Sequence, residues 1–358
     1  MNIYLKNGFA DMEKIMSLPY PLIFVIGGRG TGKTYGAVEV LLNLPPEEKF
    51  FFLRRTQDEA DTISYTDFSP FQPVINDNPE KYAPVVVQKI PHVKNISGVW
   101  HGELNDEAQL VPTGDAIGYI GALSTIHKIR GFNMQSVTIG VFDEFIPEKH
   151  VANFRGGAES EGNALLNAIE TIARNREIMG KKPFKMVCLS NANTIASPVF
   201  QSLGIIDTVN KMAMKGKQEC ILPERGIAVF IFRDSPISKA KANTSLYKAA
   251  KDGDFATMAL KNDFDASTYL YIAQQPINEY RIVANWADDV YIYRHKNSCP
   301  AKYYVTRHKS GTPKRSYHDD DISRRRFKRN EQVFLNAWLS GNVSFADYYC
   351  KYILTNIL

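Results

Sequence analysis

A glycine-rich octapeptide near the N-terminus has the residue types and spacing that bind nucleotide phosphates. It follows the pattern GxxxxGK[ST] and consists of Gly27, Gly28, Arg29, Gly30, Thr31, Gly32, Lys33 and Thr34. The glycines let successive backbone N–H groups point at phosphate oxygens, and a following helix adds its N-terminal dipole. In this pattern the lysine reaches the β- and γ-phosphates, and the last hydroxyl binds Mg²⁺. We therefore expect this octapeptide to bind ATP and Mg²⁺.

A pair of carboxylates, Asp143 and Glu144, follows the apolar run 137–142. A phosphate-binding loop needs a second carboxylate near its Mg²⁺, and Asp143 is placed to supply it. An adjacent glutamate at a strand end can polarise a water molecule for attack on the γ-phosphate, which makes Glu144 the candidate catalytic base. This pairing is typical of the ASCE-type ATPases, in which an extra strand lies between the two motifs.

Four further sites have both a functional and a purely structural interpretation. Asn191 ends the next apolar run, 184–189, where it can contact the γ-phosphate or form an ordinary turn. Arg174 and Arg176 follow an amphipathic segment and can act as arginine fingers on a neighbouring subunit, or form salt bridges at a helix end. Arg29 adds an unusual cation inside the octapeptide. The Arg54–Arg55 pair lies at a strand end, and we expect it to have a structural role rather than to contact adenine or DNA.

The elements that must position these residues alternate between strands and helices, which predicts an α/β domain with a mostly parallel sheet. A helix over 34–44 stops before Pro45 and Pro46, and a second helix covers 161–178 with an apolar stripe. The chain from 85 to 100 is expected to form a hairpin. The expected strands are 20–26, 49–55, 116–124, 137–142, 184–189 and 227–232.

The pattern changes after Pro198, and we expect three parts: an ATPase domain over 1–198, a lid or linker over 199–255, and a second domain over 256–358. Two-residue alternation between about 265 and 310 predicts an antiparallel sheet. Two helices are expected at the end, over 330–339 and 344–358. The ends of the chain carry no pattern typical of a secretory signal, and no apolar run is long enough for a membrane helix. Four widely spaced cysteines indicate reduced thiols rather than a zinc site.

The positive charge of the chain is concentrated in one segment. Residues 294–329 contain twelve lysines and arginines against three aspartates, a net charge of +9 in a chain whose total is +5. Such asymmetry predicts a polyanionic partner, with DNA, RNA or a docking surface on another protein as the open choices. A solvated loop that only aids solubility is the alternative. The candidate contact residues are Arg324, Arg325, Arg326, Lys328 and Arg329.

Together these motifs resemble one family. The stretches GGRGTGKT, VFDEFIPEK (141–149), ETIARNRE (170–177) and CLSNA (188–192) are similar to the encapsidation proteins of small short-tailed phages with protein-capped genomes. Those proteins are ring-shaped DNA-packaging ATPases related to the large terminases. The resemblance implies nucleotide and magnesium binding by Lys33 and Thr34, and a catalytic role for Glu144. It also implies that Arg174 acts on the adjacent subunit, together with either Lys128 or Arg130.

The resemblance further implies a C-terminal domain with a vestigial, RNase H-like nuclease fold and without nuclease activity. The expected function is ATP-driven translocation of double-stranded DNA into a procapsid by a homomeric ring, a pentamer, at the portal. A structural packaging RNA is a further candidate partner, and no membrane is involved. The expected location is the host cytoplasm, transiently on the procapsid and not in the mature virion. The rival hypotheses are a nucleic-acid-binding assembly and a helicase-type ATPase, each using ATP as a structural switch.

Overall fold

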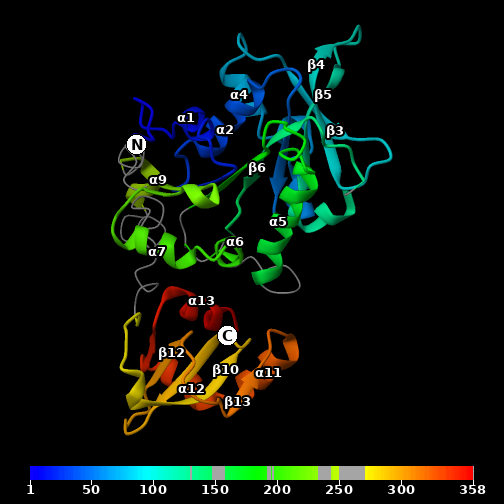
Figure 1. The fold of residues 1–358 in the computed structure, drawn as a ribbon. Helices are drawn as coiled ribbons and strands as arrows, with labels where there is room; N and C mark the ends of the chain where they lie inside the picture. Colours follow the sequence, from blue (N-terminus) through cyan, green and yellow to red (C-terminus); the bar gives the residue numbers. More distant parts are fainter. Residues whose placement is uncertain are drawn as a thin grey trace. The chain divides into compact units, whose positions relative to one another are not determined.

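The computed structural model describes residues 1–129, 131–146, 158–191, 195, 197–232, 243–249 and 271–357. Two compact units are present (Figure 1). The N-terminal unit comprises Met1–Ser202 and Lys211–Phe264, and the C-terminal unit comprises Leu203–Asn210 and Asp265–Leu358. The boundary expected at 255/256 lies outside the described residues, so the division into three parts stays a prediction.

The N-terminal unit is built on a sheet whose described strands follow the order β3-β4-β5-β2-β6-β7-β1-β9-β8. The strands from β5 to β9 in this order are parallel, and both margins are antiparallel. This confirms the mostly parallel sheet. The strands are β1 (Leu22–Gly27), β2 (Lys49–Arg54), β3 (Val85–Lys89), β4 (Ile96–Leu104), β5 (Leu110–Ala122), β6 (Val137–Asp143), β7 (Lys185–Asn191), β8 (Glu219–Leu222) and β9 (Ile227–Phe232).

The order of the central strands decides where the chemistry lies. Strand β7 lies between β1 and β6, as expected for an extra strand between the two nucleotide motifs. Because these strands are parallel, their carboxyl ends share one edge of the sheet. In the register, Gly27 is opposite Asn191, and Leu53 is opposite Phe142. The glycine loop, the acidic pair and the end of β2 therefore meet at this edge.

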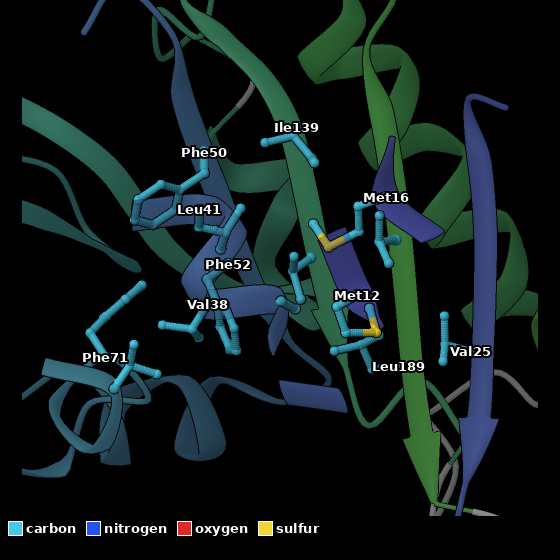
Figure 2. Close-up of a cluster of buried hydrophobic side chains, with 14 of the residues drawn as sticks. Met12, Met16, Val25, Val38, Leu41, Phe50, Phe52, Phe71, Ile139 and Leu189 are labelled. Carbon is cyan, nitrogen blue, oxygen red and sulfur yellow. The ribbon is translucent and has the colours of Figure 1, made fainter. Parts of the chain in front are cut away.

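One face of the sheet holds the helix that follows the glycine loop. Val38 and Leu41 of α2 pack in a buried apolar cluster with Phe50 and Phe52 of β2 (Figure 2). Figure 2 shows that Met12 and Met16 of α1 enter the same cluster beside Val25 and Leu189. The described helices of this unit are α1 (Met12–Met16), α2 (Lys33–Leu42), α3 (Gln57–Thr62), α4 (Gln72–Asp77), α5 (Ala158–Ala173), α6 (Pro198–Ser202) and α9 (Ser245–Ala249), and α7 (Ile206–Met214) is divided between the two units after Asn210. No described helix has the length and apolar character of a membrane span.

Helix α5 ends earlier than its apolar pattern predicts. The helix was expected to reach residue 178, but it stops at Ala173. Arg174 and Asn175 have φ angles of +40° and +58°, a left-handed conformation that ends an α-helix. The residues after this point form a hydrogen-bonded turn instead of another helical turn.

The C-terminal unit contains a second sheet with the order β13-β10-β11-β12-β14. Strands β10, β11 and β12 are antiparallel, which confirms the expected pairing. Trp286, Phe327 and Phe334 lie in its apolar core. Its strands and longer helices are β10 (Tyr280–Trp286), β11 (Val290–His295), β12 (Tyr303–Thr306), β13 (Arg315–Tyr317), β14 (Val343–Phe345), α11 (Asp321–Asn330), α12 (Gln332–Leu339) and α13 (Tyr348–Ile357).

The basic segment is not a single solvated loop. It includes strands β12 and β13 and nearly all of α11, whose N-cap residue Asp320 accepts a hydrogen bond from the Ser323 backbone N–H. Polar residues dominate this helix, so hydrophobic periodicity did not indicate it. Among the described residues no cluster of three or more His, Cys, Asp or Glu side chains has the arrangement of a metal site. The nuclease-like character of the unit stays a prediction.

A buried ion pair joins the end of β2 to the start of α5. The Arg55 Nε lies 2.7 Å from Glu161 Oε1, and the Arg55 and Glu161 side chains are 2% and 0% exposed. A second hydrogen bond of 3.2 Å makes the contact bidentate. Removing one partner from such a pair leaves the other charged and buried, which is strongly destabilising.

We therefore expect Glu161→Ala to lower the free energy of unfolding by about 3 to 5 kcal/mol. Glu170→Ala is the matched control, because Glu170 is an exposed glutamate on the same helix, and it should change stability by less than about 0.5 kcal/mol. Urea unfolding monitored by circular dichroism measures both. Equal effects of the two substitutions would contradict a stabilising role for the buried pair.

Candidate functional site

The glycine loop connects β1 to α2 in a conformation that requires glycine. Gly30 and Gly32 have φ angles of +72° and +82°. Gly32 is also the N-cap of α2, so the free N–H groups of the first helical turn face the loop. A Cβ atom on Gly27 would lie 2.8 Å from the Cβ of Phe232. The loop therefore has the backbone shape and the dipole of an anion site.

Lys33 lies inside this loop. Its residue is 6% exposed, and its Nζ donates hydrogen bonds to the carbonyl oxygens of Gly27 and Gly28, both at 2.9 Å. A third bond of 3.1 Å reaches the Thr31 hydroxyl. Because carbonyl and hydroxyl dipoles do not neutralise the ammonium charge, Lys33 retains a positive charge for phosphate oxygens approaching the loop.

The first residues of α2 contact the acidic end of β6. The Thr34 hydroxyl donates a hydrogen bond of 3.1 Å to Asp143 Oδ1. Burial raises the pKa of the Asp143 carboxyl, whereas Arg54, the Thr34 hydrogen bond and Lys33 lower it. A hydroxyl and a carboxylate oxygen side by side form the all-oxygen donor set that Mg²⁺ prefers. These two residues therefore fit the expected metal.

Arg54 is a site residue that the sequence interpretation placed elsewhere. Its Nη1 lies 3.4 Å from Asp143 Oδ2 and 3.2 Å from Glu144 Oε2, so one guanidinium faces both carboxylates. Strand β2 pairs with β6, which places the end of one beside the end of the other. The structure thus favours a role for Arg54 at the acidic pair over the structural role expected for it.

Glu144 projects from the sheet edge because the next residue is anchored. Phe145 is fully buried and contacts the rings of Phe24 and Phe200, with centroid distances of 5.3 and 5.5 Å. Its backbone N–H donates to the carbonyl of Leu189 on β7. The chain turns sharply between strand and anchor, so Glu144 adopts a φ of +62° and its side chain is 50% exposed. An exposed carboxylate in this position can reach a water molecule and a substrate.

The structure brings Asn191 to the same edge and places Arg174 elsewhere. Asn191 ends β7 opposite Gly27, next to the loop. Arg174 donates hydrogen bonds to the carbonyls of Thr171 and Phe132, at 3.2 and 3.1 Å. Phe132 precedes the first residue of β6, so Arg174 lies at the amino edge of the sheet. It therefore cannot reach the nucleotide loop of its own molecule.

The other candidates for action on a neighbouring subunit differ in exposure. Arg176 is buried, and its guanidinium donates to the backbone carbonyls of Gln135, Val137 and Lys182. This arrangement gives Arg176 a structural role, in which it clamps the turn after α5 to the start of β6. Lys128 is exposed in the 3₁₀ segment Leu123–Ile129. Arg130 lies outside the described residues.

Helix α11 presents most of the basic candidates to solvent. Arg324 is paired with Asp319 at 2.8 Å and lies 3.7 Å from Asp321, so part of its charge is compensated. The remaining basic residues of this helix are exposed: Arg325, Arg326, Lys328 and Arg329. They form the basic face of α11.

Comparisons with known proteins identify the family of the chain. The sequence profile of the podovirus DNA encapsidation protein (Gp16) family matches residues 109–292, just over half of the chain. The DNA packaging protein of Bacillus phage PZA is 26% identical over 75% of this chain and 70% of its own length. That of Bacillus phage phi29 is 29% identical over 58% of this chain and 53% of its own length.

A solved structure shows the same fold along nearly the whole chain. The viral genome packaging motor assembly of bacteriophage phi29 superposes with a TM-score of 0.67 and 19% identity, covering 97% of each chain. The profile match begins before β6 and includes the acidic pair, α5 and β7. On the extent of this match, the chain belongs to the podovirus DNA encapsidation protein (Gp16) family.

Proposed function

We propose that this protein is the ATP-hydrolysing subunit of a motor that moves double-stranded DNA into a procapsid. The observation that carries the proposal is the contact between Thr34 and Asp143, since it joins the phosphate-binding loop to the acidic strand end. Glu144 lies directly beside that contact. The chain belongs to a family of DNA encapsidation proteins, and its relatives are DNA packaging proteins. Both facts support the use of the hydrolysis energy to move DNA.

Each of these residues has its own role in ATP hydrolysis. The loop N–H groups and Lys33 hold the phosphates, while Asn191 at the adjacent strand end faces the terminal phosphate. Glu144 accepts a proton from the attacking water. A magnesium ion held by Thr34 and Asp143 would neutralise charge on the phosphate oxygens. Arg54 supplies positive charge to the same carboxylates.

The proposed assembly is a homomeric ring, a pentamer, at the portal of the procapsid. A ring explains how Arg174 can serve catalysis from the amino edge of the sheet, since it acts on the nucleotide of an adjacent subunit, with Lys128 or Arg130 as a second cation. The partners are double-stranded DNA, the portal and a structural RNA. The motor works in the host cytoplasm, without nuclease activity, and leaves before the virion matures.

The first test separates nucleotide binding from turnover. Lys33→Ala should abolish tight ATP binding, because the phosphates lose their cation. Glu144→Gln should bind ATP normally and turn over at least about 100-fold more slowly, because an amide cannot accept a proton. Titration with a fluorescent ATP analogue and a phosphate-release assay measure the two properties. Glu224→Gln, an exposed change in the same unit, is the control. Wild-type turnover by Glu144→Gln would refute the catalytic assignment.

The second test concerns action between subunits. Arg174→Ala should reduce turnover by about 10³-fold, as expected for an arginine finger. Mixing the Arg174→Ala and Glu144→Gln proteins should restore part of the activity, because some interfaces then combine an intact Glu144 with an intact Arg174. Phosphate release is measured across mixing ratios, with mixed assembly verified by differently tagged subunits. Absence of recovery in verified mixed rings argues against the role in trans.

The third test concerns the basic face of α11. Replacing Arg325, Arg326, Lys328 and Arg329 with Gln preserves helix propensity and the Arg324 ion pair. If these residues contact DNA phosphates, affinity should fall, and the slope of log K against log salt should flatten by about 0.9 per lost contact. Filter binding on duplexes of unrelated sequence measures both, and Lys309→Gln with Lys314→Gln is the control. Intact DNA binding with lost procapsid attachment would identify a docking face instead.

A further inference from the structure

Two features of the N-terminal unit lie outside the nucleotide site of the same molecule. The first is the turn formed by residues 174–182, which follows α5. At its tip, Ile178 and Met179 are 84% and 65% exposed, although both side chains are large and apolar. The second is a pocket of about 490 Å³ on the outer side of α1 and α2.

The 174–182 turn holds its apolar tip in a fixed position. Backbone hydrogen bonds close it, from Met179 to Asn175, from Gly180 to Glu177 and from Lys181 to Arg176. The Arg176 guanidinium fastens its base to carbonyl groups before and within β6. A pair of apolar side chains held out by a well-bonded turn loses little conformational entropy on binding. Such an arrangement is typical of an interaction site rather than of a frayed helix end.

The pocket is lined by both apolar and acidic side chains. Its apolar lining comes from Leu5, Met12, Val40 and Leu44, and the absence of a side chain at Gly36 lets Met12 pack closely against α2. Its charged lining consists of Asp11, Glu13 and Glu39 and one cation, Lys81. A cavity of about 150 Å³ can hold a benzene molecule, so this pocket has room for two aliphatic side chains.

We propose that Ile178 and Met179 of one subunit insert into this pocket of a second copy of the chain. The charges are complementary on balance, because Arg174 and Lys181 outnumber Glu177 around the tip, and three of the four charged residues that line the pocket are acidic. The occupant is a second copy rather than another protein, since the tip and the candidate arginine finger belong to one turn. This inference rests on the proposed action of Arg174 in trans.

The distances along the chain agree with simultaneous contacts. The pocket residues Gly36 to Val40 lie about 5 to 10 Å along α2 from Lys33, at 1.5 Å per residue. On the other subunit, Arg174 lies four residues before Ile178, a span of at most about 14 Å. These spans are short enough for a tip seated in the pocket and Arg174 at the neighbouring nucleotide loop to make contact together. The contact joins two different surfaces, which generates a closed ring when the rotation between subunits closes.

A charge exchange across the interface tests the proposal in the full-length chain. Glu39→Lys and Lys181→Glu should each weaken self-association by about tenfold, and the protein carrying both changes should recover most of it. Ile178→Asp should weaken self-association by at least as much, because a charge would enter the apolar pocket. Leu339→Ser is the matched control, since Leu339 is 87% exposed and lies in the other unit. Sedimentation velocity with and without ATP measures the association.

A second measurement locates the contact. With Cys299 changed to Ser, a mixture of Met179→Cys and Leu5→Cys proteins should form an intermolecular disulfide that neither forms alone. Unchanged association of Ile178→Asp, or no recovery in the charge exchange, would overturn the proposal. All variants should bind a fluorescent ATP analogue as the wild type does, since none lies in the loop. Failure of the wild type to hydrolyse ATP would instead refute the proposed function, and the disulfide would still report on this interface.

Discussion

The arrangement of this protein depends on one carboxylate that lies in a buried position and whose pKa is raised above its usual value. Asp143 is 6% exposed, and burial favours its neutral form. Three neighbours oppose that tendency: the Thr34 hydroxyl, the Lys33 ammonium and the Arg54 guanidinium. Lys33 and Thr34 come from the end of the glycine loop and Arg54 from the end of β2, and both parts of the chain must reach the same edge of the sheet. The strand order brings these parts together.

The apolar core supports this electrostatic arrangement from both faces of the sheet. On one face, α2 packs on β2 through Val38, Leu41 and Phe52, and this contact holds the end of the loop that precedes α2 in place. On the other face, the rings of Phe24, Phe145 and Phe200 contact one another. Because Phe145 is held in this cluster, the backbone of the adjacent Glu144 is also held in place. A catalytic base held in a left-handed turn needs such an anchor, because the conformation is unfavourable for a glutamate.

The sequence predicted those parts of the site that are continuous in the chain. The octapeptide pattern and the acidic strand end are local signals, and both lie where they were expected. Arg54 at the acidic pair escaped prediction because its role depends on β2 lying beside β6, a pairing between distant segments. The end of α5 was misplaced because the left-handed residues 174 and 175 are arginine and asparagine rather than glycine. Helix α11 was not predicted because charged residues, rather than regularly spaced apolar residues, dominate its sequence.

The adjacent arginines at the end of β2 have a consequence for how this sequence can change. Successive residues of a strand face opposite sides of the sheet, so Arg54 points to the acidic pair and Arg55 to Glu161. Inserting or deleting one residue within β2 would exchange the two faces. An insertion would place Arg54 beside Glu161 and leave the acidic pair without a guanidinium, and a deletion would place Arg55 at the acidic pair and leave Glu161 without a partner. A change in length that keeps both contacts must therefore lie outside β2, for example in the turn before Lys49.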